Sequence, residues 1–312
     1  MARPLEIGLL LRQGEQRGAD LGRVVGWSEL RDCAQAAEGV GFDTIWVADH
    51  TLMRNAGSVV LPEDVTVGVF EAFTLLGSLA EATRSVTLGP FVACTSFRNP
   101  ALLAKIADTL DEVSGGRLLL GLGAGWHQPE YDAFGYPFDH LASRFDEALQ
   151  VIVPLLRTGH VDFNGEYYQA ANCELRPRGP RGGDIPIWIG AARPRMLRLV
   201  ARYANAYNSV WHASPNDLQA PYAALDAACE DVGRNPQEIR RTAGTFAVAP
   251  GFDAPGAPPT AQRGSVEELA GKLAAFAGAG ATHLTLILDP WTVDAVKAME
   301  PVIRSVRARL AS

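Results

Sequence analysis

Short apolar runs alternate with segments of helical periodicity along the whole chain. Each run is rich in leucine, isoleucine or valine and is followed by a stretch with apolar residues at helical spacing, which is typical of βα units and a parallel sheet. This pattern predicts strands at 5–11, 43–49, 85–93, 117–123, 186–190, 206–212, 241–249 and 283–288. It predicts helices at 27–41, near 70–83, at 100–115, 141–157, 193–204, 215–232 and 265–280, and from about 292.

Eight pairs of strand and helix favour an α/β fold of the (β/α)8 TIM-barrel type, with residues 1–312 as a single domain. A doubly wound sheet stays open as the alternative, because periodicity does not show whether a sheet closes. Residues 158–184 interrupt the rhythm. There VDFNGEYYQA alternates around Asn164-Gly165, which predicts an inserted β-hairpin.

The composition indicates a globular protein that acts on small molecules. The 312 residues are 47% hydrophobic and 20% charged, with a net charge of -7, and no cluster of lysine and arginine suggests a nucleic-acid partner. The four cysteines are far apart and lack the spacing of metal ligands, so we expect a reduced, cytoplasmic protein. No apolar run is long enough for a signal peptide or a membrane span, and we expect neither.

A barrel carries its chemistry on the loops after the strands, so the carboxyl ends of the strands form a candidate list. In chain order the candidates are Arg12 and Gln13, Asp49 and His50, Cys94 to Ser96, Gly123 to His127, Gly190 to Arg193, Trp211 and His212, Ala249, and Asp289. These positions are rich in glycine and aromatic residues and poor in matched acid and base pairs. Such a rim is typical of a site in which a large planar cofactor carries the chemistry.

Other barrel chemistries fit this rim poorly. A Schiff-base enzyme needs a lysine at a strand end, and all three lysines fall in predicted helices. A glycosidase needs two opposed carboxylates, whereas Glu130 follows strand four by several residues and strand seven offers none. A metal site made of His50, His212 and Asp289 is a remote alternative, so we expect no metal.

Three stretches carry a resemblance to a known family. FDTIWVADH, FRNPALLAKIADTLDEVSGGRLLLGLGAGWHQPEYDAFG and IPIWIGAARPRMLRLVARYANAYN together resemble the luciferase-like monooxygenase superfamily, and within it the branch of coenzyme F420-dependent oxidoreductases. The resemblance covers nearly the full chain and is strongest from 40 to 210. It implies a (β/α)8 barrel with inserted segments that binds the deazaflavin F420, or alternatively FMN, in its mouth.

The resemblance implies hydride transfer between reduced F420 and a small, apolar organic substrate. Asp49 and His50 match the acidic residue and the histidine that follow strand two in this family, where the histidine is the usual proton donor beside the deazaflavin. An imidazole titrates near neutral pH and can deliver the proton that accompanies hydride transfer. The alternative is that His50 only caps the following loop.

The ends of strands three and four match positions that contact the cofactor in the family. Phe91 and Val92 stand where F420-dependent members often have a bulge with a non-proline cis peptide against the ring. Cys94 stands where relatives often place a hydroxyl group near the cofactor, and a small buried thiol is an equal alternative. Ala124 and Gly125 match the cofactor-contacting loop after strand four.

Trp126 separates this chain from one branch of the family. The sugar-phosphate dehydrogenases carry a glutamate base at this position, a tryptophan where this chain has Arg54, and lysines for the substrate phosphate. A tryptophan at position 126 predicts an apolar stacking wall in place of the base. The resemblance therefore does not point to a sugar phosphate as substrate.

The segment from Gly190 to Arg193 precedes a predicted helix and matches the phosphate loop of the family. Gly190, Ala191 and Ala192 let the backbone come close to an anion, and free N–H groups at a helix N-terminus favour negative charge. Arg193 adds charge-assisted bonds in this interpretation. The alternative is an ordinary exposed arginine at a helix start.

The glycines of GLGAGW are interpreted as strand residues and not as a dinucleotide-binding loop. The spacing G-x-G-x-x-G before a helix is absent, and Gly121 and Gly123 leave room inside a crowded barrel. Because Gly125 continues the alternation, the strand is expected to extend over all three glycines.

Two further functions stay open on the sequence alone. One is an FMNH2-dependent monooxygenase, which needs a partner reductase, and the other is a barrel that binds F420 or flavin without catalysis. The resemblance also implies a homodimer. The substrate depends on the loops 54–68, 158–184 and 250–263, where the resemblance is weakest.

Overall fold

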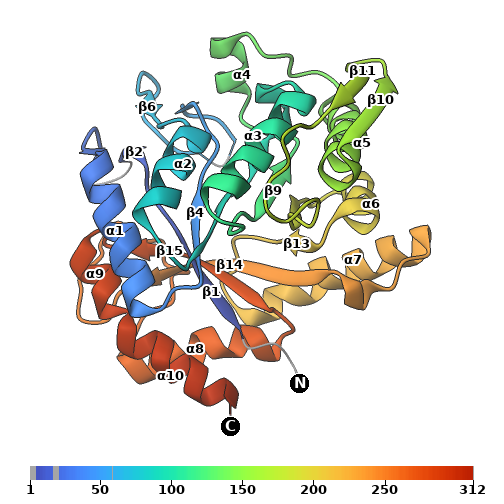
Figure 1. Ribbon diagram of the computed structural model, residues 1–312. Coiled ribbons are helices and arrows are strands. Elements are labelled where there is room, and N and C mark those ends of the chain that lie inside the picture. Colours follow the sequence, from blue (N-terminus) through green and yellow to red (C-terminus); the bar gives the residue numbers. More distant parts are fainter. Residues whose placement is uncertain (1–4, 17–20, 58, 312) are drawn as a thin grey trace.

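The chain forms a ring of parallel strands surrounded by helices, as a computed structural model shows (Figure 1). The structure describes residues 5–16, 21–57 and 59–311. The strands of the ring are β1 (Glu6–Leu10), β4 (Thr44–Val47), β7 (Thr87–Pro90), β8 (Ala93–Cys94), β9 (Leu120–Gly123), β12 (Ile187–Gly190), β13 (Ala206–Asn208), β14 (Arg240–Val248) and β15 (His283–Asp289). They pair in the order β7-β4-β1-β15-β14-β13-β12-β9-β8, and every pairing is parallel.

The ring closes between β7 and the segment that leads into β9. Leu88 forms a parallel bridge with Leu118. The N–H of Leu88 donates to the carbonyl of Arg117 at 3.0 Å, and the N–H of Leu119 donates to the carbonyl of Leu88 at 2.8 Å. The predicted (β/α)8 barrel is confirmed, and the doubly wound alternative, whose sheet stays open, is wrong.

Strand three is in two pieces, so nine strands take the place of the eight that the pattern predicts. β7 ends at Pro90 and β8 begins at Ala93, with a cis peptide bond between Phe91 and Val92. Strand four begins later than the predicted range 117–123, because β9 runs from Leu120 to Gly123. Gly125 has a φ of 84°, a left-handed conformation that no strand contains, so the expected extension of the strand to Gly125 is wrong.

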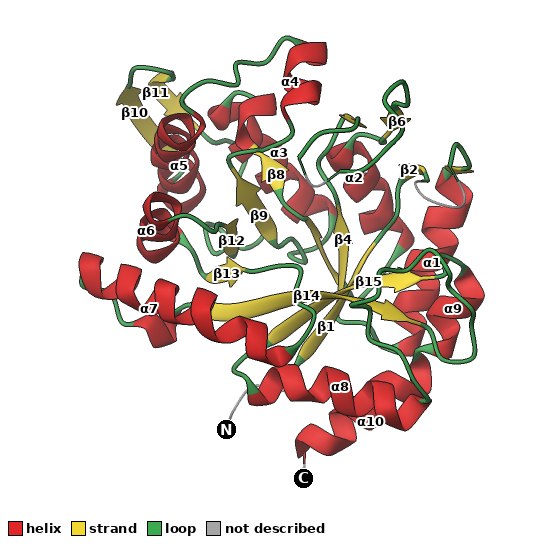
Figure 2. Cartoon of the chain, turned by 180° about the vertical axis from the view of Figure 1, so that it is seen from behind, coloured by secondary structure: helices red, strands yellow, loops and turns green. Residues whose placement is uncertain are grey.

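The helices lie outside the ring in both overall views (Figure 2). They are α1 (Trp27–Val40), α2 (Ala72–Ala82), α3 (Pro100–Val113), α5 (Leu141–Thr158), α6 (Pro194–Tyr203), α7 (Gln219–Val232), α8 (Val266–Gly278), α9 (Val293–Ala298) and α10 (Glu300–Ala311). The Asn99 side chain caps α3 ahead of Pro100, and Ser265 with Glu268 forms a capping box at α8. The last predicted helix is two helices, and residues 215–218 form a 3-10 turn before α7.

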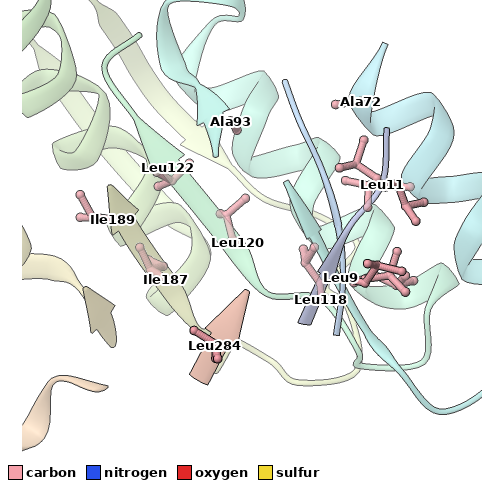
Figure 3. Packing of buried hydrophobic residues seen from close by; sticks show 14 of the residues in the cluster. Leu9, Leu11, Ala72, Ala93, Leu118, Leu120, Leu122, Ile187, Ile189 and Leu284 are labelled. Carbon is pink, nitrogen blue, oxygen red and sulfur yellow. The ribbon is translucent and has the colours of Figure 1, made fainter. Parts of the chain in front are cut away.

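Alternation along the strands separates an outer apolar layer from the barrel interior. Leu120 and Leu122 on β9, and Ile187 and Ile189 on the neighbouring β12, belong to the main core between strands and helices (Figure 3). Trp188, between the two isoleucines, belongs instead to a separate cluster inside the ring. Side chains therefore fill the barrel on both sides of each strand, as expected when helices cover a parallel sheet.

The barrel interior holds large aromatic rings that need glycine opposite them. Trp46 and Trp188 are almost completely buried, and their ring centroids are 5.0 Å apart. A Cβ atom on Gly8 or on Gly89 would lie 2.6 Å from an atom of Trp46, which is closer than side chains approach. The strand glycines thus make room for the indole rings.

The predicted insertion is a β-hairpin that packs beside α5. It consists of β10 (His160–Asn164) and β11 (Gln169–Glu174), which pair in antiparallel fashion. The turn is longer than the dipeptide Asn164-Gly165 suggests, because the N–H of Gly165 donates to the carbonyl of Tyr168 at 2.9 Å.

Several small elements lie at the end of the barrel where the strands finish, and the sequence pattern did not predict them. They are the hairpins β2 (Gly14–Glu15) with β3 (Val24–Val25) and β5 (Leu52–Met53) with β6 (Val67–Gly68), and the short helix α4 (Gln128–Phe134). β2, β6 and α4 lie at the upper end of the molecule in Figure 1, and the chain termini lie at the lower end. Among the described helices, none is long and apolar enough to cross a membrane.

Candidate active site

Asp49, just after β4, is the centre of a buried cluster of charges. Arg98 donates to both of its oxygens, at 2.7 and 2.9 Å, and the backbone N–H of Cys94 donates to Oδ2 at 2.9 Å. Arg98 also pairs with Glu71 at 2.5 Å and lies 4.6 Å over the ring of Phe73. Burial opposes the charge on Arg98, but the bonds to Asp49 and Glu71 outweigh it and raise the pKa of the guanidinium. Asp49 therefore ties the end of β4 to the start of α3.

His50 is held by a carboxylate that comes from another loop. Its Nδ1 lies 2.8 Å from Oε1 of Glu130, and Oε2 of Glu130 accepts hydrogen bonds from the N–H and the hydroxyl of Thr51 at 2.9 and 3.2 Å. Glu130 is 1% exposed, whereas the side chain of His50 is 18% exposed. The sequence pattern places Glu130 only as a carboxylate several residues after strand four. The sequence signal for the short helix α4 is Pro129, its second residue, because proline is favoured in the first turn of a helix.

Trp126 lies beside His50 and faces solvent. It is 48% exposed, and its ring meets the imidazole edge-on with centroids 5.5 Å apart. The next residue, His127, is buried, and its Nε2 accepts the backbone N–H of Arg54 at 3.1 Å. The loop after β9 thus binds the chain at the end of β5 and presents an exposed indole, and the apolar wall at Trp126 stays a prediction.

A non-proline cis peptide lies at the place that the resemblance indicates, between Phe91 and Val92. Phe91 packs against Trp211, with ring centroids 5.8 Å apart. A Cβ on Gly121 would lie 3.0 Å from the Val92 side chain, and one on Gly123 would lie 2.7 Å from it. The interpretation of these two glycines as strand residues that leave room is therefore confirmed.

Gly125 allows Cys94 and Tyr131 to meet. A Cβ at this position would lie 1.7 Å from the Tyr131 hydroxyl and 2.7 Å from Sγ of Cys94. The thiol and the hydroxyl are 3.0 Å apart, and the hydroxyl donates to the carbonyl of Ala124 at 3.0 Å. Burial raises the pKa of Cys94 to about 12. Of the two alternatives for Cys94, the structure favours the small buried thiol. A contact of Cys94 or Ala124 with a cofactor stays a prediction.

The loop from Gly190 to Arg193 joins β12 to α6. Gly190 and Ala191 are half-buried, Ala192 and Arg193 are exposed, and Arg193 is an N-cap whose side chain makes no capping bond. A Cβ on Gly190 would lie 3.5 Å from Val92, so this loop lies next to the cis peptide. Arg193 forms no ion pair with any residue in the described ranges.

The remaining candidates lie at other strand ends. Arg12 pairs with Asp289 at 2.7 Å, and the hydroxyl of Ser209 lies 2.7 Å from Nε2 of His212. Burial lowers the pKa of His212. Within residues 5–16, 21–57 and 59–311, no three His, Cys, Asp or Glu side chains form a group that could hold a metal ion. The alternative of a metal site at His50, His212 and Asp289 gains no support.

The sequence profile of one family matches most of the chain. It is the profile described as luciferase-like monooxygenase, and the match covers residues 6–251. This chain belongs to the luciferase-like monooxygenase family. The family is the one that the sequence resemblance indicated.

Two curated relatives of this luciferase-like protein are reductases by name. The 5,10-methylenetetrahydromethanopterin reductase of Archaeoglobus fulgidus is 31% identical over 207 residues, which are 66% of this chain and 56% of the relative. The phthiodiolone/phenolphthiodiolone dimycocerosates ketoreductase of Mycobacterium kansasii is 31% identical over 226 residues, 69% of this chain and 61% of the relative. The matches thus span less than two thirds of the length of either relative.

A solved structure shares the fold of this luciferase-like barrel. It is the coenzyme F420-dependent tetrahydromethanopterin reductase of Methanopyrus kandleri, with a TM-score of 0.76 and 20% sequence identity. The likeness covers 96% of this chain and 99% of that chain. At this identity the likeness concerns the fold.

Proposed function

We propose that this protein is an F420-dependent oxidoreductase that transfers a hydride between the reduced deazaflavin and a small, apolar organic substrate. In this proposal His50 is the proton donor. The observation that carries the proposal is the setting of His50, a partly exposed imidazole with one nitrogen on buried Glu130 and its ring against the exposed Trp126. An imidazole held in this way can deliver a proton to a fixed point.

The residues at the mouth fit a planar ring with an anionic tail. Phe91 and Val92 are half-buried and Trp126 is exposed, so apolar surface is available for a ring. Arg193 and the free N–H groups at the start of α6 suit a phosphate. A Cβ on Gly190 would be in van der Waals contact with Val92, so the two features lie next to each other. The names of the relatives, two reductases and one F420-dependent reductase, support the same choice.

When bound, reduced F420 supplies a hydride. His50 supplies the proton that the substrate takes up, and Trp126 limits the access of water from its side of the mouth. Asp49 takes no part in the proton transfer, because Arg98 binds both of its oxygens. The role of Asp49 is to orient the backbone that carries His50.

A cofactor titration tests the proposal. Tryptophan fluorescence of the purified protein is followed against F420 and, separately, against FMN, with equilibrium dialysis as a check on inner-filter effects. We expect F420 to bind with a micromolar dissociation constant and FMN to leave the signal unchanged. Binding of FMN without binding of F420 would overturn the proposal.

An FMNH2-dependent monooxygenase is the second candidate function, favoured by the family to which the chain belongs. It requires a partner reductase and oxygen uptake that depends on FMNH2. Reduced F420 incubated with a panel of enones, imines and quinones separates turnover from storage of the cofactor. Binding without reduction of any member would favour the non-catalytic alternative.

We also propose that the protein is a cytoplasmic homodimer that pairs through α2 and α3. The groove between these helices is lined by Phe73, Ile106 and Leu110, and Leu102 and Val113 are 53% and 43% exposed. A second copy would remove this apolar surface from water. Light scattering is expected to give twice the chain mass, and Leu102→Asp a single chain mass. A monomeric wild-type protein at micromolar concentration would exclude the dimer.

A further inference from the structure

We infer that Glu130 is a positioning residue for His50. It keeps the proton of neutral His50 on Nδ1 and so leaves Nε2 as the nitrogen that exchanges a proton with the substrate. The inference rests on the proposed function, because it assigns a role within the same site. Its evidence is the one hydrogen bond at Oε1 and the two hydrogen bonds at Oε2 of Glu130, together with the burial of this carboxylate.

The hydrogen bonds of Glu130 decide where the shared proton lies. Oε2 accepts from both the N–H and the hydroxyl of Thr51, at 2.9 and 3.2 Å, so it acts as an acceptor. An ionised carboxylate only accepts, and therefore Nδ1 of His50 is the donor in the 2.8 Å bond to Oε1. Neutral His50 then has its lone pair on Nε2, and protonated His50 has a proton there.

Burial shows that Glu130 acts through His50 and not on the substrate. Glu130 is 1% exposed, so no bound molecule reaches its carboxylate from the mouth. The carboxylate of Glu130 lies on α4 and is directed at the histidine.

The imidazole of His50 has neighbours on several sides, and Glu130 makes the hydrogen bond to its Nδ1. The Trp126 ring meets it at an interplanar angle of 83°. The backbone before His50 is tied through Asp49 to Arg98, and the backbone after it is tied through Thr51 to Glu130. In the part of the chain that the structure describes, no other group hydrogen-bonds the imidazole. Loss of Glu130 therefore frees both the tautomer and the rotation of the ring.

The proton step balances without a proton reaching the carboxylate. Protonated His50 gives its Nε2 proton to the substrate as the substrate accepts the hydride, and the electron pair of the N–H bond stays on Nε2. The substrate is reduced by two electrons and the deazaflavin is oxidised. The neutral histidine that results is the Nδ1–H tautomer already bound to Glu130.

Nitrogen NMR of the full chain tests the tautomer without any turnover. In protein labelled with 15N-histidine, the signals of His50 are assigned by comparison with His50→Asn. We expect neutral His50 to be protonated on Nδ1 in the wild type, and Glu130→Ala to shift it towards the Nε2–H tautomer that free imidazole side chains favour. An Nε2–H tautomer in the wild type would overturn the inference, even if F420 binds as proposed.

Kinetics test whether Glu130 acts through His50. Glu130→Ala, and Glu130→Gln as the variant that keeps the shape, are expected to lower kcat about 10- to 100-fold, with KM and F420 affinity within about two-fold of wild type. Asp132→Ala, which removes an exposed carboxylate from the same helix α4, is the control and is expected to stay near wild type. Glu130→Ala should have no further effect in a His50→Ala background. A wild-type kcat in both Glu130 variants, or an additive loss in the double variant, would overturn the inference.

Discussion

The residues after β4 and the residues after β12, on two sides of the barrel mouth, differ in how many of their polar groups form hydrogen bonds within the protein. After β4, Asp49 is bound by Arg98 and His50 by Glu130, and both carboxylates are buried. After β12, the loop that ends at Arg193 is partly exposed, and the N-cap of α6 makes no side-chain bond. The carboxylates and the imidazole after β4 are hydrogen-bonded within the protein, whereas no side chain caps the start of α6.

This difference matches two demands of hydride-transfer chemistry. A proton donor must be oriented before the substrate arrives, because misplacement of reacting groups slows the reaction steeply. A phosphate site instead gains affinity from donors that the protein leaves free. Under the proposed function we expect the β4 side to govern turnover and the β12 side to govern cofactor affinity, and the following changes test the arrangement of the site.

The largest expected effect is on stability, from Arg98→Met. The change leaves Asp49 with its charge buried and unpaired, so the free energy of unfolding should fall by about 3–5 kcal/mol. Urea denaturation measures the change. Arg195→Met is the matched control, because Arg195 is exposed on α6 and, among the described residues, bonds only the Ser143 hydroxyl. Equal stabilities for the two variants would show that the Asp49 cluster is not a fixed part of the site.

His50→Ala is expected to lower kcat about 10²- to 10⁴-fold and to leave the F420 dissociation constant near that of the wild type. The reason is that the imidazole is assigned to the proton transfer and the phosphate loop to affinity. Steady-state kinetics and fluorescence titration measure the two quantities. His160→Ala, on the exposed hairpin strand β10, is the control. Normal turnover of His50→Ala would remove the proton-donor role.

Arg193→Gln is expected to weaken F420 binding and to leave kcat unchanged, the opposite of His50→Ala. Loss of a charge-assisted bond to the cofactor phosphate should raise the F420 dissociation constant about 10-fold, with kcat at saturating F420 unchanged. Titration of Arg202→Gln, which alters an exposed arginine in the last turn of the same helix, controls for net charge. If both variants bind F420 like the wild type, the phosphate does not lie at this loop.

The smallest effect concerns the pH dependence of stability. The folded protein raises the pKa of Cys94 from 9.0 to about 12, so the protonated thiol stabilises the fold below pH 9 and this contribution is lost as the pH rises towards 12. Between about pH 9 and 10.5 the wild type should lose up to about 1.4 kcal/mol per pH unit more than Cys94→Ser. Chemical denaturation at several pH values measures the difference. Identical losses would mean that the thiol is not buried against Tyr131.

The repeated pattern of strands and helices predicted the barrel, because local periodicity decides both kinds of element. The split of strand three at Phe91 and Val92 was not readable from that pattern, because both residues are apolar and fit a strand as well as a break. Gly125 shows the same limit. Alternating glycines fit a strand, but Gly125 has a φ of 84°, and the close approach of Tyr131 leaves no room for a Cβ there.

The candidate site was predictable where it follows directly from strand ends, as at Asp49 and His50. Their partners were not, because Arg98 and Glu130 reach them from the loops after other strands. Such contacts depend on how neighbouring loops pack, and no spacing in the sequence encodes that packing. The assignment of any of these residues to a bound cofactor stays a prediction.

Hydrogen exchange with and without F420, followed by mass spectrometry, tests the division between the two sides most directly. We expect F420 to slow exchange in peptides that cover 190–197 and to leave those that cover 48–54 and 128–134 unchanged, because amides such as those of Thr51 and Arg54 are already hydrogen-bonded. FMN is expected to protect neither region. Protection confined to 48–54 and 128–134, or equal protection by FMN, would contradict the account.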